Sequence, residues 1–261
     1  MTGINVFFSK DGRSRLALPT DGGHIATMPP NELASAIPVP RSEFYDVETW
    51  IFDLDNTLYH VSPEMHGEVD ELLGSFVSEF LDVDRTEARR IQKAYFHEFG
   101  MTLCGLIVNH DLNPEVYFQH MLQADLSGIS ADPALVNVIA ALEGRKIIYS
   151  NAPSAHVKQV LEQIGLTPHV DAIHDIETAG FKPKPAHSAY VDLCRRYTIA
   201  PERAVMIDDI PRNLEPAAEI GMTTVWKKTD AEWAIDVENL DYVHHVTDDL
   251  LAWLQALSIR A

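Results

Sequence analysis

The stretch TWIFDLDNTLYH, residues 49–60, places two carboxylates directly behind an apolar run. Residues 50–52 are Trp, Ile and Phe, which predicts a buried strand over residues 49–54. Asp53 and Asp55 stand where that strand would end, although burial disfavours a charged group. Ligands of an open parallel sheet bind beyond the carboxyl ends of its strands. The two carboxylates are therefore candidate site residues if this strand belongs to such a sheet.

Strand and helix patterns alternate from residue 132 to the end of the chain. The strand patterns are RKIIYS at 145–150, DAIHDI at 171–176, RAVMIDD at 203–209, TTVWKK at 223–228 and DYVHHV at 241–246. Strands that alternate with helices predict an α/β fold, a doubly wound parallel sheet with right-handed crossovers. We assign residues 46–61 and 127–261 to this core.

Residues 62–126 interrupt the alternation with helical patterns alone. This block is too long for a crossover and too regular for a loop. We therefore expect a helical cap over the sheet, inserted between its first and second strands. Its helices are predicted to begin at Ser62-Pro63, at Asp84 with Glu87 three residues on, and at Asn113-Pro114, and the second is predicted to end at Gly100.

The first 45 residues differ from the rest because they are rich in Pro, Gly and small side chains and show no period. Such a composition predicts an extended or disordered arm over residues 1–45. An arm that packs along the domain surface is the open alternative.

The formal net charge of −19 restricts the partners of this chain. An acidic surface repels phosphate backbones and anionic lipid, so we expect neither a nucleic-acid polymer nor a membrane as partner. A small phosphorylated substrate is compatible if one local site is electropositive. Cys104 and Cys194 lie far apart in the sequence, which indicates two buried free thiols in a reducing cytosol. No apolar run has the length of a membrane span. We expect a cytoplasmic protein of undetermined oligomeric state.

Polar residues follow four of the expected strands. They are Asp53-Leu54-Asp55-Asn56-Thr57, Ser150-Asn151, the loop with Lys182 and Lys184, and Asp208-Asp209. Converging carboxylates repel one another unless a cation compensates them, and Mg²⁺ prefers carboxylate and carbonyl oxygens. A lysine adds positive charge, and Ser150 and Asn151 offer donors to phosphate oxygens. The arrangement predicts a Mg²⁺-dependent phosphoryl-transfer site in which a carboxylate can act as nucleophile.

These four clusters resemble the four motifs of the haloacid dehalogenase (HAD) superfamily, over about residues 49–255. The resemblance implies a Rossmann-like core with a cap inserted just after the first motif. DLDNTLY at 53–59 and YFHEFGMTLCGL at 95–106 resemble more closely the pyrimidine 5′-nucleotidase branch. Cys104 stands where that branch commonly carries a basic or polar residue.

The resemblance also implies roles for the first two clusters. Asp53 would attack phosphorus, and Asp55 would protonate the leaving oxygen and then activate the hydrolytic water. Ser150 and Asn151 would bind phosphate, and Thr57 would orient the first loop. Asp55 favours phosphate-ester hydrolysis over dehalogenation, because an alkoxide needs a proton on leaving and a halide does not.

The resemblance implies further roles for the last two clusters. The side chains of Asp53 and Asp209 and the backbone carbonyl of Asp55 would hold Mg²⁺. Asp208 is the second choice as a metal ligand after Asp209, because consecutive strand residues point to opposite sides and the two cannot face the metal equally. The spacing Lys-Pro-x-x-x-x-aromatic fits Lys184 and Tyr190, which favours Lys184 over Lys182 as the catalytic lysine.

Substrate selection is expected from the cap, because the core motifs contact only phosphate. Tyr95 could stack on a base and Thr102 could hydrogen-bond its edge, which predicts the nucleotides UMP and CMP as substrates. One alternative is a phosphatase or phosphomutase acting on a sugar phosphate or phosphoglycolate. Another is a non-catalytic regulatory binding protein, although the presence of Asp53 and Asp55 disfavours it.

Overall fold

The computed structural model describes residues 5–8, 14–17, 44–229 and 239–258. The chain divides into two units, Met1–Ser42 and Glu43–Ala261. In the first unit, β1 (Asn5–Phe8) and β2 (Ser14–Ala17) form an antiparallel pair. The sequence did not predict these strands within the expected arm. The remainder of residues 1–43 lies outside the described part, so the extended or disordered alternative is not tested there.

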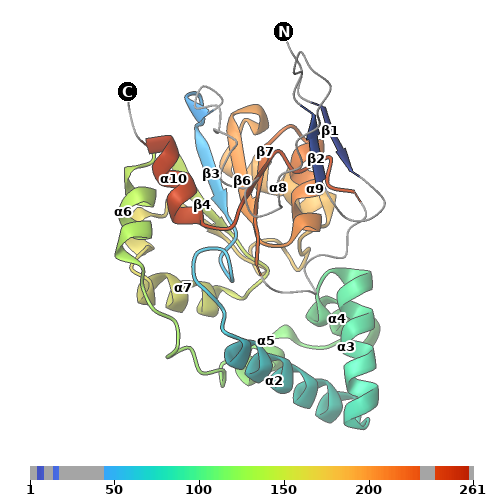
Figure 1. Ribbon diagram of the computed structural model, residues 1–261. Helices are drawn as coiled ribbons and strands as arrows, with labels where there is room; N and C mark the ends of the chain where they lie inside the picture. The colour runs from blue at the N-terminus through green and yellow to red at the C-terminus, as the bar shows by residue number, and fades with distance from the viewer. Residues whose placement is uncertain (1–4, 9–13, 18–43, 230–238, 259–261) are drawn as a thin grey trace. The chain divides into compact units, whose positions relative to one another are not determined.

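A six-stranded parallel sheet forms the centre of the second unit (Figure 1). Its strands are β3 (Thr49–Phe52), β4 (Arg145–Tyr149), β5 (Ala172–His174), β6 (Ala204–Asp208), β7 (Thr223–Lys227) and β8 (His245–Thr247). Their order is β5-β4-β3-β6-β7-β8, and every neighbouring pair is parallel. The order runs outward from β3 in both directions, which confirms the predicted doubly wound α/β fold.

Helices cover both faces of this sheet. α6 (Pro133–Ala141) and α10 (Leu250–Ser258) lie on one face, and α8 (His187–Tyr197) and α9 (Pro211–Glu219) lie on the other (Figure 1). α7 (Ser154–Gln163) follows β4, and short 3₁₀ turns span Thr167–His169 and Pro201–Arg203. Alternate strand residues form one apolar core with α8 and α9, because successive side chains of a strand point to opposite faces. The core includes Ile51, Ile147, Tyr149, Met206, Tyr190, Leu193 and Leu214.

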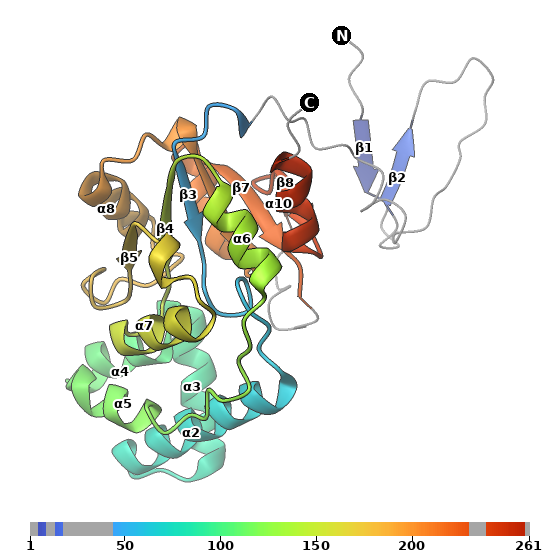
Figure 2. The same ribbon diagram turned by 90° about the vertical axis from the view of Figure 1, so that its left-hand side faces the viewer.

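Four helices inserted between β3 and α6 form the cap (Figure 2). They are α2 (Pro63–Leu81), α3 (Arg85–Phe99), α4 (Thr102–His110) and α5 (Pro114–Met121). The predicted N-caps at Ser62, Asp84 and Asn113 accept backbone N–H donors as expected. Glu87 does not complete a capping box, because its carboxylate accepts from Arg90 instead. None of the described helices has the length and apolar character that a membrane span needs.

Helix α4 was missed at the sequence level. Its residues Thr102–Leu106 are all buried, so it shows no alternation of polar and apolar faces. Its N-cap is Met101, which makes no side-chain capping bond. Gly105 lies against the ring of Tyr95, where an added Cβ would come within 2.3 Å of Tyr95 Cγ. Gly105 lets α3 pack closely on α4. In the sequence, however, a glycine disfavours a helix, so the same residue argued against predicting α4.

His174, at the end of β5, makes the stability of the chain sensitive to acid. Burial, reinforced by the positive charge of Arg196, lowers the pKa of His174 from 6.5 to about 4. Neither ring nitrogen has a hydrogen-bond partner within the part of the chain that the structure describes. The contribution of neutral His174 to the free energy of unfolding is complete above pH 6.5, the pKa in the unfolded chain. It is lost as the pH falls toward about 4, the pKa in the folded chain, because the unfolded chain binds the proton more readily.

His174→Phe is expected to weaken this acid sensitivity, because phenylalanine keeps the edge contacts with Tyr149 and Tyr197 without titrating. Urea unfolding at about pH 7.5 and about pH 5 measures it, and the parent should lose on the order of 2 kcal/mol more than the variant. His97→Phe, at an exposed position, is the control. Equal losses in the parent and His174→Phe would contradict the assignment.

Candidate active site

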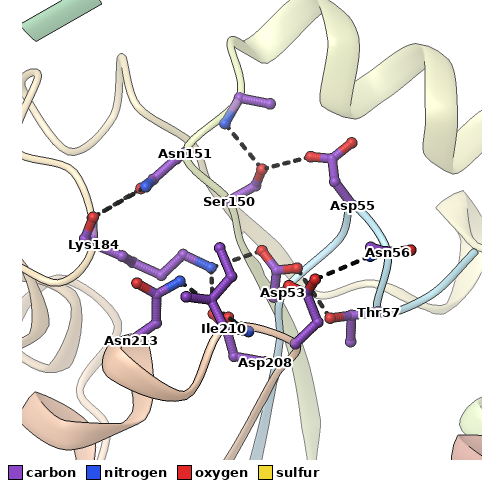
Figure 3. Close-up of polar contacts among 12 residues, drawn as sticks. Asp53, Asp55, Asn56, Thr57, Ser150, Asn151, Lys184, Asp208, Ile210 and Asn213 are labelled. Carbon is purple, nitrogen blue, oxygen red and sulfur yellow. Dashed lines mark hydrogen bonds and ion pairs between the residues drawn. The ribbon is translucent and has the colours of Figure 1, made fainter. Parts of the chain in front are cut away.

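The carboxyl ends of β3, β4 and β6 bring the predicted residues together (Figure 3). Lys184, from the loop between β5 and α8, donates to Asp53 Oδ1 at 2.7 Å and to Asp208 Oδ2 at 2.6 Å. The Lys184 side chain is 1% exposed, whereas that of Lys182 is 52% exposed and pairs with Asp192 at 3.2 Å. The structure therefore places Lys184 inside the cluster and Lys182 outside it, and the catalytic role of Lys184 stays a prediction.

Asp53 is held on both of its carboxylate oxygens. Oδ1 accepts from Lys184, and Oδ2 accepts from the Thr57 hydroxyl at 3.0 Å. The backbone N–H of Asp53 donates to Ile207 O at 2.9 Å, which continues the pairing of β3 with β6. Thr57 therefore orients the Asp53 side chain itself, in addition to the loop that both belong to.

Asp208 and Asp209 have different surroundings despite their adjacency. Asp208 is fully buried, and its Oδ1 accepts from Ile210 N at 2.9 Å and Asn213 Nδ2 at 3.0 Å (Figure 3). Asp209 accepts from Asn56 Nδ2 at 3.2 Å. Because Asp208 already engages Lys184 and two further donors, Asp209 has more free ligand capacity. The predicted ranking of Asp209 before Asp208 as a metal ligand stays a prediction, since both belong to the acidic cluster.

The carboxylates of Asp53, Asp208 and Asp209 fit a divalent cation. One ligand oxygen from each lies within 4.8 Å of the others, and all three residues are buried. Burial raises the pKa of Asp53, because the Lys184 charge does not fully offset burial and the neighbouring Asp208 carboxylate. Burial and the charges of Asp53 and Asp208 also raise the pKa of Asp209. Three buried carboxylates with one lysine lack positive charge, and hard oxygen donors of this kind suit Mg²⁺.

Asp55 has two partners that the sequence analysis missed. His156 Nε2 lies 2.8 Å from Asp55 Oδ1, and the Tyr59 hydroxyl donates to the same oxygen at 2.5 Å. Burial disfavours the ionised form of Asp55 and by itself raises its pKa. The contacts with His156 and Tyr59 outweigh burial and lower the pKa of Asp55. Burial likewise opposes protonation of His156, yet Asp55 raises the pKa of that ring. A lone histidine without ligand spacing gave no signal, and only the spacing of four residues from Asp55 to Tyr59 hinted at a contact.

Ser150 and Asn151 both line the cavity, and their side chains already have partners within the core. Asn151 Oδ1 accepts from Lys184 N at 2.8 Å, and Asn151 Nδ2 donates to Lys184 O at 3.1 Å. Both ends of the Asn151 amide thus hold the lysine loop, but its Nδ2 has a second N–H and Asn151 lines the cavity, so its predicted phosphate contact stays a prediction. Ser150 Oγ accepts from Ala152 N at 3.0 Å and lies 3.5 Å from Asp55 Oδ2.

The loop that carries Lys184 also contacts the cap. Phe181 packs into the apolar cluster of the cap and stacks on Phe118 with 6.3 Å between ring centroids. Gly100, which ends α3 with a φ of 76°, lies so close to this loop that an added Cβ would be 2.7 Å from Lys184 O. Only glycine adopts this φ without strain and leaves room for that carbonyl.

A cavity of about 1470 Å³ opens above these residues, between the core and the cap. Asp53, Asp55, Lys184 and Asp209 line it from the core, and Phe96, Gly100, Met101, Phe118 and Met121 line it from the cap. The expected substrate contacts of Tyr95 and Thr102 do not fit their positions, because neither lines the cavity. The Thr102 hydroxyl donates to Gln92 O at 3.1 Å, and the Tyr95 hydroxyl lies 2.7 Å from His110 Nε2, so both hold the cap together.

Comparisons with known proteins agree with this geometry. A family profile described as haloacid dehalogenase-like hydrolase matches residues 47–221, which is more than half of the chain. Phosphate metabolism protein 8 of Saccharomyces cerevisiae is 24% identical over an alignment of 136 residues, and the alignment covers 48% of this chain and 42% of the yeast protein. The match therefore spans less than half of that curated relative.

Solved structures support the fold. A HAD phosphatase from Thermococcus onnurineus has a TM-score of 0.56 at 16% identity, over 81% of this chain and 98% of that one. The HAD-hydrolase YfnB from Bacillus subtilis bound to magnesium has a TM-score of 0.53 at 16% identity, over 82% and 99%. A dehalogenase with an intermediate complex has a TM-score of 0.54 at 17% identity, over 83% and 99%.

Proposed function

Because this chain belongs to the haloacid dehalogenase-like hydrolase family, we propose that it is a Mg²⁺-dependent phosphomonoesterase that acts through an aspartyl-phosphate. The observation that carries the proposal is the pair of carboxylates on the cavity wall, Asp53 and Asp55. Asp53 is oriented by one hydrogen bond to each oxygen, which leaves a lone pair free for attack, and Asp55 supplies the acid that an alkoxide leaving group needs.

The reaction has two steps that reuse the same side chains. A carboxylate oxygen of Asp53 attacks phosphorus, the bond from phosphorus to the ester oxygen breaks, and that oxygen takes a proton from Asp55. Asp55 then removes a proton from a water whose oxygen attacks the aspartyl-phosphate, which releases inorganic phosphate and restores the Asp53 carboxylate. Lys184 stabilises negative charge beside Asp53 throughout.

Mg²⁺ would be held by Asp53, Asp209 and the backbone carbonyl of Asp55, with Asp208 second, and when bound it supplies positive charge to the phosphate oxygens. Asp55 must be protonated in the first step, although its partners lower its pKa in the substrate-free chain. A dianionic phosphate next to Asp55 favours the protonated carboxyl, since a like charge raises a carboxyl pKa.

Within this reaction class we propose UMP and CMP as the preferred substrates. The segment 95–106 supports the proposal through Phe96, which lines the cavity and can stack on a base. The Arg212 guanidinium lies 4.3 Å from the Phe96 ring centroid and holds that ring at the boundary of cap and core. Discrimination against purines depends on contacts at Phe96, because a cavity of about 1470 Å³ has room for either base.

That volume favours a second candidate, a phosphatase of broad substrate range. Small-molecule sites commonly occupy about 300–1,000 Å³, so the cavity exceeds what one small ester fills. A substrate panel separates the two candidates.

Phosphate release from UMP, CMP, AMP, GMP and p-nitrophenyl phosphate, with Mg²⁺ and with EDTA, tests the proposal. We expect release that EDTA abolishes, with kcat/KM higher for UMP and CMP by about tenfold or more. Phe96→Ala should lower kcat/KM for UMP more than for p-nitrophenyl phosphate, and Phe80→Ala, at an exposed cap position outside the cavity lining, is the control. Equal values for purines and pyrimidines would leave the broad phosphatase, and no release from any ester would exclude both candidates.

A further inference from the structure

The two oxygens of the Asp55 carboxylate have unequal surroundings. His156 Nε2 and the Tyr59 hydroxyl both contact Oδ1, at 2.8 Å and 2.5 Å. Within the described residues, the contact of Oδ2 is with Ser150 Oγ, at the long distance of 3.5 Å (Figure 3). An ionised carboxylate only accepts, so His156 with a proton on Nε2 donates to Oδ1, which then accepts two hydrogen bonds, whereas Oδ2 accepts at most one weak one.

The two contacts to Oδ1 come from different parts of the core. Tyr59 lies four residues after Asp55, in the segment that leads from β3 to α2, whereas His156 lies in the first turn of α7. Together they join the loop after β3 to the helix after β4. All three side chains line the cavity, and the side chain of Asp55 is 38% exposed. Packing alone therefore does not fix this carboxylate.

We propose that His156 and Tyr59 are positioning residues that hold Asp55 by Oδ1 and so assign the transferred proton to Oδ2. A carboxyl oxygen that already accepts two hydrogen bonds has no free direction in which to carry a proton. Oδ2 faces away from these donors and is the oxygen available to the ester. The inference rests on the phosphomonoesterase reaction proposed above and adds two residues to it.

In the first step, the proton on Oδ2 passes to the ester oxygen as the bond between that oxygen and phosphorus breaks, which leaves Asp55 as a carboxylate. In the second step, Oδ2 accepts a proton from the attacking water. His156 and Tyr59 keep their own protons in both steps and contact only Oδ1. Without His156 or Tyr59, the Asp55 carboxyl would still be present but would no longer be held in position to protonate the ester oxygen. Misplacement of a catalytic group by about 1 Å can lower a rate about 10²-fold.

Leaving-group dependence separates this positioning role from a general structural role. An alkyl phosphate needs the proton in the transition state, whereas p-nitrophenolate leaves without one. For His156→Ala we expect kcat/KM to fall about 10- to 100-fold with UMP and by no more than about threefold with p-nitrophenyl phosphate. The ratio kcat/KM is used because it reports steps up to formation of the aspartyl-phosphate, and the later hydrolysis is common to both esters.

Two further variants keep the test decisive. His156→Gln retains a side-chain donor and should recover part of the UMP activity, and Tyr59→Phe should show the same selective loss as His156→Ala. Glu162→Ala, at an exposed position of α7 outside the cavity lining, is the matched control and should change neither substrate. Thermal melting of each variant verifies that it is folded.

Equal losses on both esters, or no loss on UMP, would overturn the positioning role. Failure of the parent enzyme to release phosphate from either ester would instead overturn the phosphomonoesterase proposal, so the two failures are distinguishable. Selective loss on UMP in both His156→Ala and Tyr59→Phe supports the assignment of the proton to Oδ2.

Discussion

Asp53→Asn is expected to abolish phosphate release while the chain remains folded. An amide cannot attack phosphorus, so no aspartyl-phosphate forms. The substitution keeps the size of the side chain, and it removes a charge that burial and the neighbouring Asp208 disfavour, the two effects that raise the pKa of Asp53. Steady-state rates with p-nitrophenyl phosphate and Mg²⁺ measure the loss, and thermal melting verifies the fold.

The same change at Asp192 is the matched control. Asp192 lies on α8 and pairs with Lys182 and Arg195 outside the cavity lining, so Asp192→Asn should keep the parent rate. A rate for Asp53→Asn within about tenfold of the parent would remove Asp53 from the nucleophile role.

Lys184→Met is expected to lower the rate by a factor of about 10²–10³, the usual effect of losing one preorganised charge stabiliser. Its ammonium lies 2.7 Å from Asp53 Oδ1 and 2.6 Å from Asp208 Oδ2, inside a buried cluster. The variant should also melt at a lower temperature, because breaking a buried ion pair commonly costs about 3–5 kcal/mol. Rate and melting temperature are measured on the same samples.

Lys182→Met is the control for this variant, since Lys182 is exposed and pairs with Asp192 at the surface of α8. It should keep both the rate and the melting temperature, because exposed ion pairs contribute little. A large loss of rate in Lys182→Met together with a small loss in Lys184→Met would show that the lysine was assigned wrongly.

The fold was predictable because its strands and helices carry local signals. β3, β4 and β6 are short apolar runs that end in polar residues, and three cap helices begin at side chains that accept backbone N–H donors. One topological rule predicts which residues converge in the site: the carboxyl ends of parallel strands lie at the same edge of the sheet. This rule explains why Asp53, Lys184 and Asp208 were placed together before their contacts were known.

Contacts that join distant segments were not predictable in the same way. The bidentate contact of Asn151 with the Lys184 backbone and the contact of His156 with Asp55 depend on how loops from different crossovers meet. Tyr95 and Thr102 were misjudged because α4 was not recognised. Where α3 and α4 pack together, Tyr95 on α3 contacts His110 and Thr102 on α4 donates to Gln92 O. Phe96 and Met101 line the cavity instead.

The close approach of Gly100 to the carbonyl of Lys184 means that the cap and the backbone of Lys184 are mechanically connected. Gly100, at the end of α3, lies close to the same carbonyl of Lys184 to which Asn151 Nδ2 donates. The Cys104 thiol and the Phe118 ring meet Phe181 three residues earlier. If the cap tilts to admit a substrate, it must either break these contacts or pull the lysine backbone with it. Access to the cavity and the charge environment of Asp53 would then change in one movement.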